Sequence, residues 1–417
     1  MKRFTLVALL SALAIGPASA QETIKWLHLE TNPGMVELMN EAVAEYKGLH
    51  PEANFELQFL ENEAYKAKLT TLLQSDDAPD IVYSWGGGVL DEQVKSGVLR
   101  DIDGAVSADA KTNVGATGVG AFTRDGKLYG IAQHVSEVVF WYNKELFAKA
   151  GLDPATMNTW DGFLAGVKKL QDAGITPIAL GAGDKWPAHF YWSYLVVKLA
   201  GEDGFNAAKT GKGDGFAGPA FVEAGKKFLQ LAEMHPFQEG FQTSTHDQST
   251  GYFGDGKAAI LLMGDWAYTN QRVQSASKEG LSDDQLGMFP FPSVEGGAGD
   301  PTDTLGGING WIFPKGASDD AVKFMEWYES KPYMSKMGAA GYNIPIVAGA
   351  ADAMTNPFKV QIAKNINAAH WHAVFFDQVL GPAVGGVVND VSAELADTAI
   401  SAEEAAKLVK EAVDDSL

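Results

Sequence analysis

The chain has 417 residues, of which 46% are hydrophobic and 20% charged, so it is a globular protein long enough for two or three domains. Its formal charge of −21 argues against nucleic acid and anionic membranes as partners, because both require basic patches. The absence of cysteine excludes disulfide bonds and a lipid-bearing N-terminal cysteine.

The N-terminal segment predicts export. A basic start and a short apolar run precede three small residues at 18–20. We expect a cleavable signal peptide over residues 1–20 and a mature start at Gln21. The apolar run is too short to predict a membrane span, and no later stretch is long and apolar enough for one. An exported chain without cysteine indicates a soluble periplasmic protein.

The remaining chain alternates between strand patterns and helix patterns. The expected strands are 23–29, 54–60, 81–84, 127–131, 138–142, 175–180, 258–263 and 311–314. The expected helices are 33–49, 65–74, 146–150, 159–173, 189–199, 219–234, 319–330, 393–399 and 402–413. This alternation indicates βαβ units and an α/β fold, in which ligands lie at the carboxyl ends of strands.

Three strand ends carry candidate binding residues, namely Glu30, Trp85 and Asp265. The third is the most informative, because the strand 258–263 ends in Gly264-Asp265-Trp266. A glycine that permits close approach, a carboxylate and a flat ring together suit a small polyol. The alternative is an ordinary strand end followed by a packed tryptophan.

Three interruptions predict crossings between two lobes. Polar residues at 132–136 break an extended stretch, residues 287–292 are extended and bounded by prolines, and residues 341–345 form a rigid turn.

At this point an ordered set of segments resembles a known family. The segments are TIKWLHLE, APDIVYSWGGG, YGIAQHVSEVVFWYNKELF, NTWDGF, YFGDGKAAILLMGDW and GYNIPI. In this order they resemble the extracellular solute-binding proteins of carbohydrate ABC importers (family 1), of which the maltodextrin-binding proteins are the best-known members. YSWGGG and VFFDQVLGP are more similar to the binders of raffinose-type or xylo-oligosaccharide ligands. The resemblance covers nearly the whole mature chain.

The resemblance implies a type II periplasmic-binding-protein fold, in which two α/β lobes enclose a cleft and are joined by hinge crossings. We expect the lobes to be discontinuous, with residues 21–134 and 289–345 in lobe 1 and residues 135–288 and 346–417 in lobe 2. The implied function is capture of a mono- or oligosaccharide in the cleft, by stacking and hydrogen bonds, and its delivery to the membrane permease. The resemblance implies neither a cofactor nor a metal. The protein is expected to be a monomer, and it is not expected to be an enzyme.

Planar rings suit the C–H faces of a sugar, and short carboxylates and amides suit its hydroxyl edges. The expected ligand-binding set combines positions that match the family's pattern with neighbours that could line the cleft through backbone or amide groups: Glu30, Trp85, Gly86, His134, Ser136, Trp186, Asp265, Trp266, Gly307, Asn309, Trp371, Phe376 and Asp377. Asp265 has an alternative role, which is to fix the turn that presents Trp266. Phe375 and Phe376 have core packing as their alternative, because only one of two adjacent rings faces a cleft easily.

Other functions stay open at this stage. A protein of the same fold could bind an anionic sugar or a non-carbohydrate solute. A secreted glycoside hydrolase would need two carboxylates on either side of one bond, and no spacing singles out such a pair. His370, His372 and Asp377 suggest a metal site, but zinc needs three or four convergent ligands and the chain has no second histidine cluster.

Overall fold

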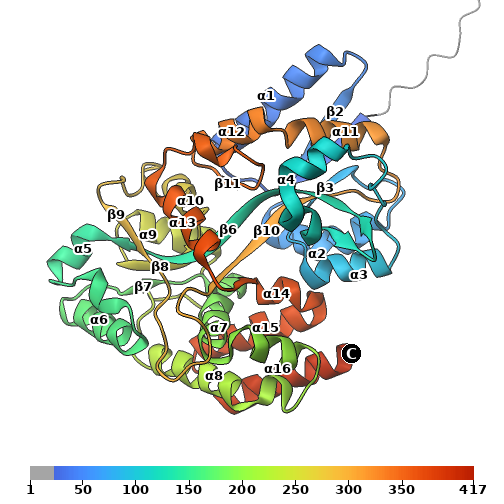
Figure 1. Ribbon diagram of the computed structural model, residues 1–417. Coiled ribbons are helices and arrows are strands. Elements are labelled where there is room, and N and C mark those ends of the chain that lie inside the picture. The colour runs from blue at the N-terminus through green and yellow to red at the C-terminus, as the bar shows by residue number, and fades with distance from the viewer. Residues whose placement is uncertain (1–22) are drawn as a thin grey trace, which may run out of the picture.

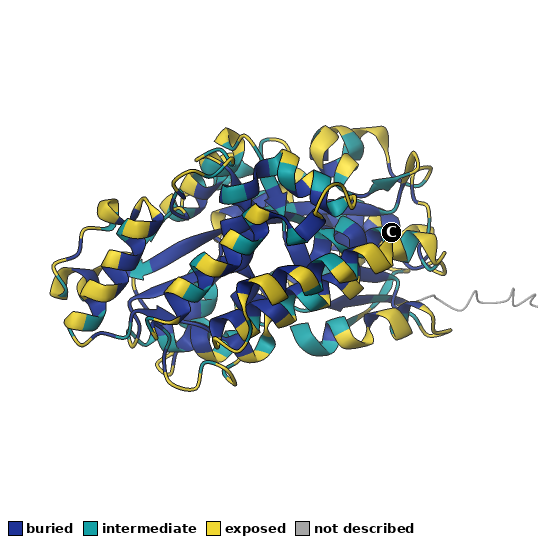
Figure 2. Ribbon diagram, turned by 90° about the horizontal axis from the view of Figure 1, so that it is seen from below, coloured by how far each residue is buried: buried dark blue, intermediate teal, exposed yellow. Residues whose placement is uncertain are grey.

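The computed structural model describes residues 23–417, so the predicted signal peptide and the start at Gln21 lie outside the described residues. Two separate hydrophobic clusters form the interior. One draws mainly on residues 24–132 and 311–350, and the other on residues 138–305 and 362–413. We call the parts built on these clusters lobe 1 and lobe 2; they lie on either side of a pair of long strands (Figure 1), and each has a buried interior (Figure 2).

Lobe 1 is a small parallel sheet covered by helices, as the βαβ pattern predicts. Its strands are β1 (Thr23–His28), β2 (Asn54–Phe59) and β3 (Ile81–Ser84), and β1 pairs in parallel with both others. Its other elements are α1 (Pro33–Leu49), α2 (Asn62–Leu73), α3 (Gly87–Lys95), α4 (Ala108–Ala121), β4 (Thr123–Arg124), β5 (Lys127–Leu128), α11 (Asp319–Tyr328) and α12 (Lys331–Ala339). The cap of α1 is typical: Asn32 Oδ1 accepts hydrogen bonds from the amides of Gly34 and Met35, and proline occupies the first turn.

Lobe 2 contains most of the remaining helices. They are α5 (Lys144–Lys149), α6 (Trp160–Asp172), α7 (Trp186–Lys209), α8 (Pro219–Ala232), α9 (His246–Gly254), α10 (Ala267–Gln274), α13 (Pro357–Ala368), α14 (Phe376–Val379), α15 (Gly381–Ala396) and α16 (Ala402–Ser416). Its strands are β7 (Ile178–Ala179), β8 (Ile260–Gly264), β9 (Leu286–Phe289) and β12 (His372–Val374). Helix α7 starts earlier than predicted, so Trp186 stands at a helix start rather than inside a loop.

Two long strands run from one lobe into the other. They are β6 (Gly130–Asn143) and β10 (Thr304–Ile312), which pair antiparallel in the sheet order β2-β1-β3-β10-β6-β8-β7. The polar stretch 132–136 therefore does not interrupt the strand. Glycine allows the close pairing, because a Cβ at Gly306 would lie 1.8 Å from the carbonyl oxygen of Ser136. Because of this pairing, β10 begins at Thr304, seven residues before the predicted start at Trp311.

The two clusters also bear on where the chain returns to lobe 1. Phe291, Val294 and Leu305 pack in the lobe 2 cluster, and Trp311 packs in the lobe 1 cluster. We therefore propose that the return crossing lies within β10 rather than at residue 288. The short strand β11 (Ile344–Pro345) pairs with β6 and accompanies the last passage into lobe 2.

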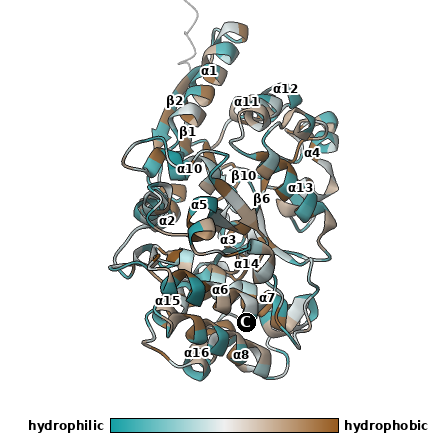
Figure 3. Cartoon of the chain, turned by 90° about the vertical axis from the view of Figure 1, so that its left-hand side faces the viewer, coloured by the Kyte–Doolittle hydropathy of each residue, from teal (hydrophilic) through white to brown (hydrophobic). Residues whose placement is uncertain are grey.

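In the described part of the chain, every helix is too short or too polar to cross a bilayer. Hydrophilic and hydrophobic residues are mixed along the helices, in agreement with one packed face and one exposed face (Figure 3).

The crossing on β6 contains a buried acid, Glu137, which predicts a pH effect on stability. Glu137 pairs with Gly306 on β10 and accepts a 3.2 Å hydrogen bond from Asn365 Nδ2. Burial raises the pKa of Glu137 from its ordinary value of 4.5 to about 8. The folded state therefore keeps a proton that the unfolded state loses, so this group's contribution to stability is full below about pH 4.5 and is lost as the pH rises through about 8.

We expect Glu137→Gln to remove this loss, because glutamine resembles the protonated acid at every pH. Its free energy of unfolding should match that of the wild type at about pH 4.5 and exceed it increasingly up to about pH 8. Urea denaturation at both pH values measures the difference. The exposed Glu295→Gln is the control, and a difference that does not change with pH would contradict the prediction.

Candidate ligand-binding cleft

A cavity of about 340 Å³ lies between the lobes, at the carboxyl ends of several strands. Glu30 follows β1, Trp85 follows β3 and Trp266 follows β8, which is where ligands lie in α/β sheets. The following residues of the predicted set line it: Glu30, Trp85, His134, Trp186, Asp265, Trp266, Asn309 and Asp377. Residues as far apart in sequence as Glu30 and Asp377, from both lobes, thus line one cavity.

Aromatic rings form the lobe 2 wall. The ring of Trp266 lies 6.5 Å from that of Trp186 and 6.2 Å from that of Phe375, centroid to centroid. The ring rests on Gly264, where an added Cβ would lie 2.1 Å from it. The glycine of the Gly-Asp-Trp segment is therefore required for the position of the ring.

The carboxylate of Asp265 is already paired inside the protein. Lys359 Nζ lies 2.5 Å from Asp265 Oδ2, and it also donates to the backbone carbonyls of Asp265 and Tyr342, at 3.0 and 3.3 Å. Both side chains of the pair are buried, and burial raises the pKa of Asp265 while Lys359 opposes this rise. The contacts support the alternative role of Asp265, which is to hold the turn before Trp266.

Glu30 has a different environment. Its carboxylate lines the cavity, and burial raises the pKa of Glu30 to about 7, although the charge of Lys359 opposes this shift. At neutral pH this group is therefore able both to donate and to accept a hydrogen bond.

His134 and Asn309 meet on the paired strands β6 and β10. Burial lowers the pKa of His134 to about 3, so the ring is neutral at pH 7. Its Nε2 lies 3.0 Å from Asn309 Nδ2, and its Nδ1 lies 3.1 Å from Gln133 Oε1. Nδ1 then carries the proton and Nε2 accepts from the asparagine.

Several buried polar atoms of residues that line the cavity have no hydrogen-bond partner among the described residues. They are Trp186 Nε1, His189 Nε2, Asn309 Oδ1 and Asn343 Oδ1. Most buried polar groups in proteins are hydrogen-bonded, so this group of atoms in one cavity needs an explanation.

Carboxylates outnumber cations around the cavity. The acidic residues that line it are Glu30, Glu61, Glu63, Asp184, Asp247, Asp265 and Asp377. Among the described lining residues, Lys66 is the only lysine or arginine. Several of the acids have structural partners: Asp184 accepts from the amide of His246, and Asp247 accepts from Gln274 Nε2.

The remaining predicted site residues lie elsewhere. Ser136 is buried in the β6–β10 ladder with Oγ 3.5 Å from the carbonyl of Gly307, and Gly86 lines a second cavity of about 540 Å³. Trp371 packs on Phe205, 5.6 Å between centroids, outside the first cavity.

The prediction that Phe376 binds ligand is corrected, because its neighbour Phe375 takes the place in the cavity. Phe376 stacks on Phe205 at 4.3 Å in the core, whereas Phe375 lines the cavity, because adjacent side chains point in different directions. Gly307 contributes indirectly: an added Cβ there would lie 2.7 Å from the ring of Phe375.

His370 and His372 do not converge on a ligand. His372 Nδ1 lies 2.8 Å from Thr304 Oγ1, and His370 Nδ1 lies 3.3 Å from Asp303 Oδ1. Among residues 23–417 no group of three or more potential ligands could hold a metal ion.

Sequence reasoning missed many lining residues, among them Asn32, Glu61, Lys66, His189, His246 and Tyr342. A usable signal existed for two of them. Asn32 caps α1 and Glu61 caps α2, and each helix follows a parallel strand. A capping residue in that position lies at the carboxyl edge of the sheet, which is the ligand edge.

Residues 32–335, well over half of the chain, match the family described as bacterial extracellular solute-binding protein. An uncharacterized ABC transporter extracellular-binding protein of Pyrococcus horikoshii is 29% identical over 203 residues, 48% of this chain and 45% of that protein. That match spans less than half of the Pyrococcus protein. The sn-glycerol-3-phosphate-binding periplasmic protein UgpB of Brucella abortus is 26% identical over 344 residues, 75% of this chain and 71% of that one.

Solved structures show the same fold. A structure reported with xylan utilization by Caldanaerobius polysaccharolyticus has a TM-score of 0.87 and 25% identity, and covers 94% of this chain and 99% of that one. A chitin oligosaccharide binding protein has a TM-score of 0.83 and 24% identity, and covers 94% and 98%.

Proposed function

Because the chain belongs to the bacterial extracellular solute-binding protein family, we propose that it is the binding component of an ABC importer for a neutral mono- or oligosaccharide. It captures the sugar in the cleft and delivers it to the membrane permease. It acts in the periplasm, as a monomer, after removal of residues 1–20.

The observation that carries this proposal is the combination of clustered aromatic rings with buried polar atoms that lack a hydrogen-bond partner, all on residues that line one cavity. Trp186, Trp266 and Phe375 offer faces and edges for C–H groups. Trp186 Nε1 is a donor and Asn309 Oδ1 is an acceptor, and neither has a partner among the described residues. A sugar hydroxyl both donates and accepts, so a sugar that reaches these buried atoms as the cleft adjusts around it satisfies both kinds at once. A ligand without such groups would leave them unpaired, at a cost that gives specificity.

The charge of the cleft supports a neutral ligand over an anionic one. Seven acidic residues line the cavity with Lys66 as the single lysine or arginine among the described lining residues. An anion would be repelled by these carboxylates. The relative named for sn-glycerol-3-phosphate therefore supports the family and the transport role rather than that ligand.

We propose that the protein binds its sugar without converting it chemically. Asp265, Asp184 and Asp247 hold positions in the protein through Lys359, a backbone amide and Gln274, respectively. These contacts support a positioning role for the acids rather than an acid and base on either side of a bond. Ligand favours closure because residues of both lobes contact it only when the cleft is closed.

A thermal-shift screen over neutral and anionic sugars tests the proposal. A neutral mono- or oligosaccharide should raise the melting temperature, because a ligand that binds only the folded state stabilises it. At about 100 times the dissociation constant, the stabilisation is about 2.7 kcal/mol. Glycerol 3-phosphate should give no shift.

The same samples supply two checks. Small-angle scattering should show compaction with the sugar that gives the shift, and chromatography should recover that sugar unchanged. A shift only with phosphorylated or anionic solutes would overturn the neutral-sugar assignment, and turnover would overturn the non-enzymatic one.

A further inference from the structure

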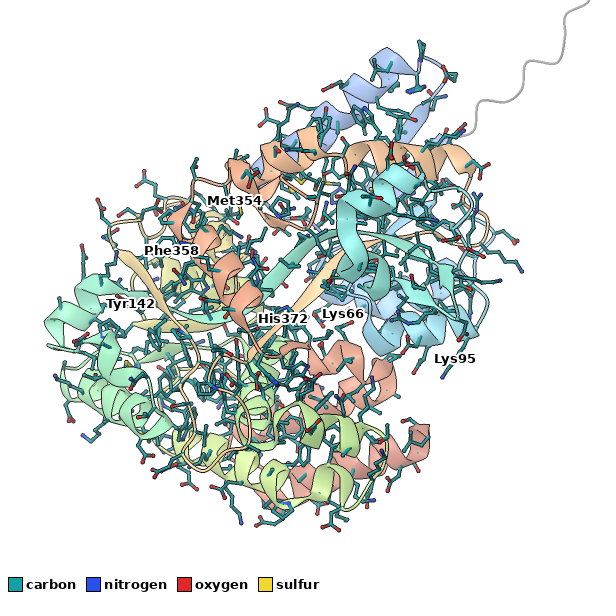
Figure 4. The ribbon with its side chains drawn as sticks, in the orientation of Figure 1. Lys66, Lys95, Tyr142, Met354, Phe358 and His372 are labelled. Carbon is teal, nitrogen blue, oxygen red and sulfur yellow. The ribbon has the colours of Figure 1, made fainter. Side chains whose placement is uncertain are left out.

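Lys66 places an ammonium group between two tryptophans that come from different lobes. Its Nζ lies 5.6 Å from the ring centroid of Trp85 in lobe 1 and 5.5 Å from that of Trp186 in lobe 2. The same atom lies 3.6 Å from Glu63 Oε1 and 4.0 Å from Asp377 Oδ2. Lys66 is labelled in Figure 4, at the junction of the lobes. We call the four partners, Trp85, Trp186, Glu63 and Asp377, the ammonium cage.

The cage has the chemistry that recognises an alkylammonium group. Cations within about 6 Å of a tryptophan centroid are attracted by the ring face, and the attraction is stronger when the cation is partly desolvated. Here the side chain of Lys66 is 27% exposed and that of Asp377 is 7% exposed. Two rings and two carboxylates therefore surround one positive charge that belongs to the protein itself.

We propose that Lys66 determines which ligand charge the cleft accepts, because its ammonium occupies the position that the ammonium group of an amino sugar would otherwise take. This inference rests on the proposed function and names the residue that makes the cleft specific for neutral sugars. With Lys66 present, a ligand ammonium meets a like charge and finds the cage filled. A neutral sugar meets a cation that donates hydrogen bonds to its hydroxyls.

Removal of the charge should reverse the preference. In Lys66→Met the aliphatic stem remains, but the rings and the carboxylates of Glu63 and Asp377 lose their cation. A protonated amino sugar can then enter the cage and neutralise them. The cleft holds six acidic lining residues besides Asp265, so the field also favours a cation once Lys66 is neutral.

The test measures two ligands that differ only by an ammonium in place of a hydroxyl on each ring, cellobiose and the β-1,4-linked glucosamine dimer. Calorimetry is done at about pH 6, where a sugar amine with a pKa near that of an α-amino group is protonated. Lys66→Met should bind the glucosamine dimer at least tenfold more tightly than the wild type does, which corresponds to about 1.4 kcal/mol.

Two matched variants separate charge from structure. Lys66→Arg keeps the positive charge and should not gain affinity for the glucosamine dimer. Lys68→Met removes an exposed charge from the same helix and should have no effect. Equal melting temperatures of the unliganded proteins establish that each variant is folded.

The outcomes distinguish this inference from the proposed function. If Lys66→Met is folded and binds the glucosamine dimer no better than the wild type, the assignment of Lys66 is overturned, whatever neutral sugars do. If Lys68→Met gains the same affinity, the effect is only net charge and the cage is overturned. If the wild type binds no neutral sugar in the screen, the proposed function fails instead.

Discussion

Lys359→Met is expected to lower the free energy of unfolding by about 3–5 kcal/mol, because it leaves a buried carboxylate without its cation. Lys359 is fully buried and Asp265 has a side-chain exposure of 3%, and their charged atoms are 2.5 Å apart. Lys359 also donates to the carbonyls of Asp265 and Tyr342. Its loss removes three contacts that join α13, the turn after β8 and the segment before β11.

Urea denaturation at neutral pH measures this loss. Lys364→Met, an exposed lysine on the same helix, should change the stability little. The double variant Asp265→Asn/Lys359→Met should recover part of the stability, because no buried charge then lacks a partner. A single variant as stable as the wild type would show that Asp265 is not held as the structure places it.

The second large effect concerns binding. Trp266→Ala is expected to weaken the affinity for the sugar found in the screen by at least tenfold, on the order of 1.4 kcal/mol. The ring lies against Gly264, between Trp186 and Phe375, so alanine removes the centre of the aromatic wall. Aromatic side chains dominate the binding energy of such sites.

Calorimetry of Trp266→Ala and Trp266→Phe measures this contribution, and the phenylalanine variant should keep most of the affinity. Trp327→Ala removes a partly buried tryptophan from the lobe 1 cluster, outside the cleft, and should leave the dissociation constant unchanged. A folded Trp266→Ala with the wild-type affinity would remove Trp266 from the binding site.

Local sequence patterns determined most of the elements of this fold. Helix α1 begins at Pro33 because Asn32 caps it, and its buried face follows the predicted spacing through Met39 and Ala42. The strand β8 and the Gly-Asp-Trp segment after it also follow from neighbouring residues, since an apolar run needs burial and a glycine must precede a ring that turns back over it. The order of such segments was enough to identify the family.

Only the tertiary structure determined how the charged side chains of the cleft are paired. Nothing near Asp265 in sequence reveals Lys359, because the two are 94 residues apart and a lone lysine in a helix predicts an exposed side chain. The choice between Phe375 and Phe376 depends on where Phe205 packs and on the room that Gly307 leaves.

The same holds for Lys66, which lies on a helix of ordinary composition and meets Trp186 only because the lobes face each other. Local propensity and periodicity depend on neighbours within a few turns, so they determine which elements form and which faces are buried. Ion pairs, ring contacts and unpaired polar atoms depend on how distant elements pack. The sequence by itself therefore determined the lobes' elements and the class of protein, and only the folded chain decided which side chains share the cleft and which charge it carries.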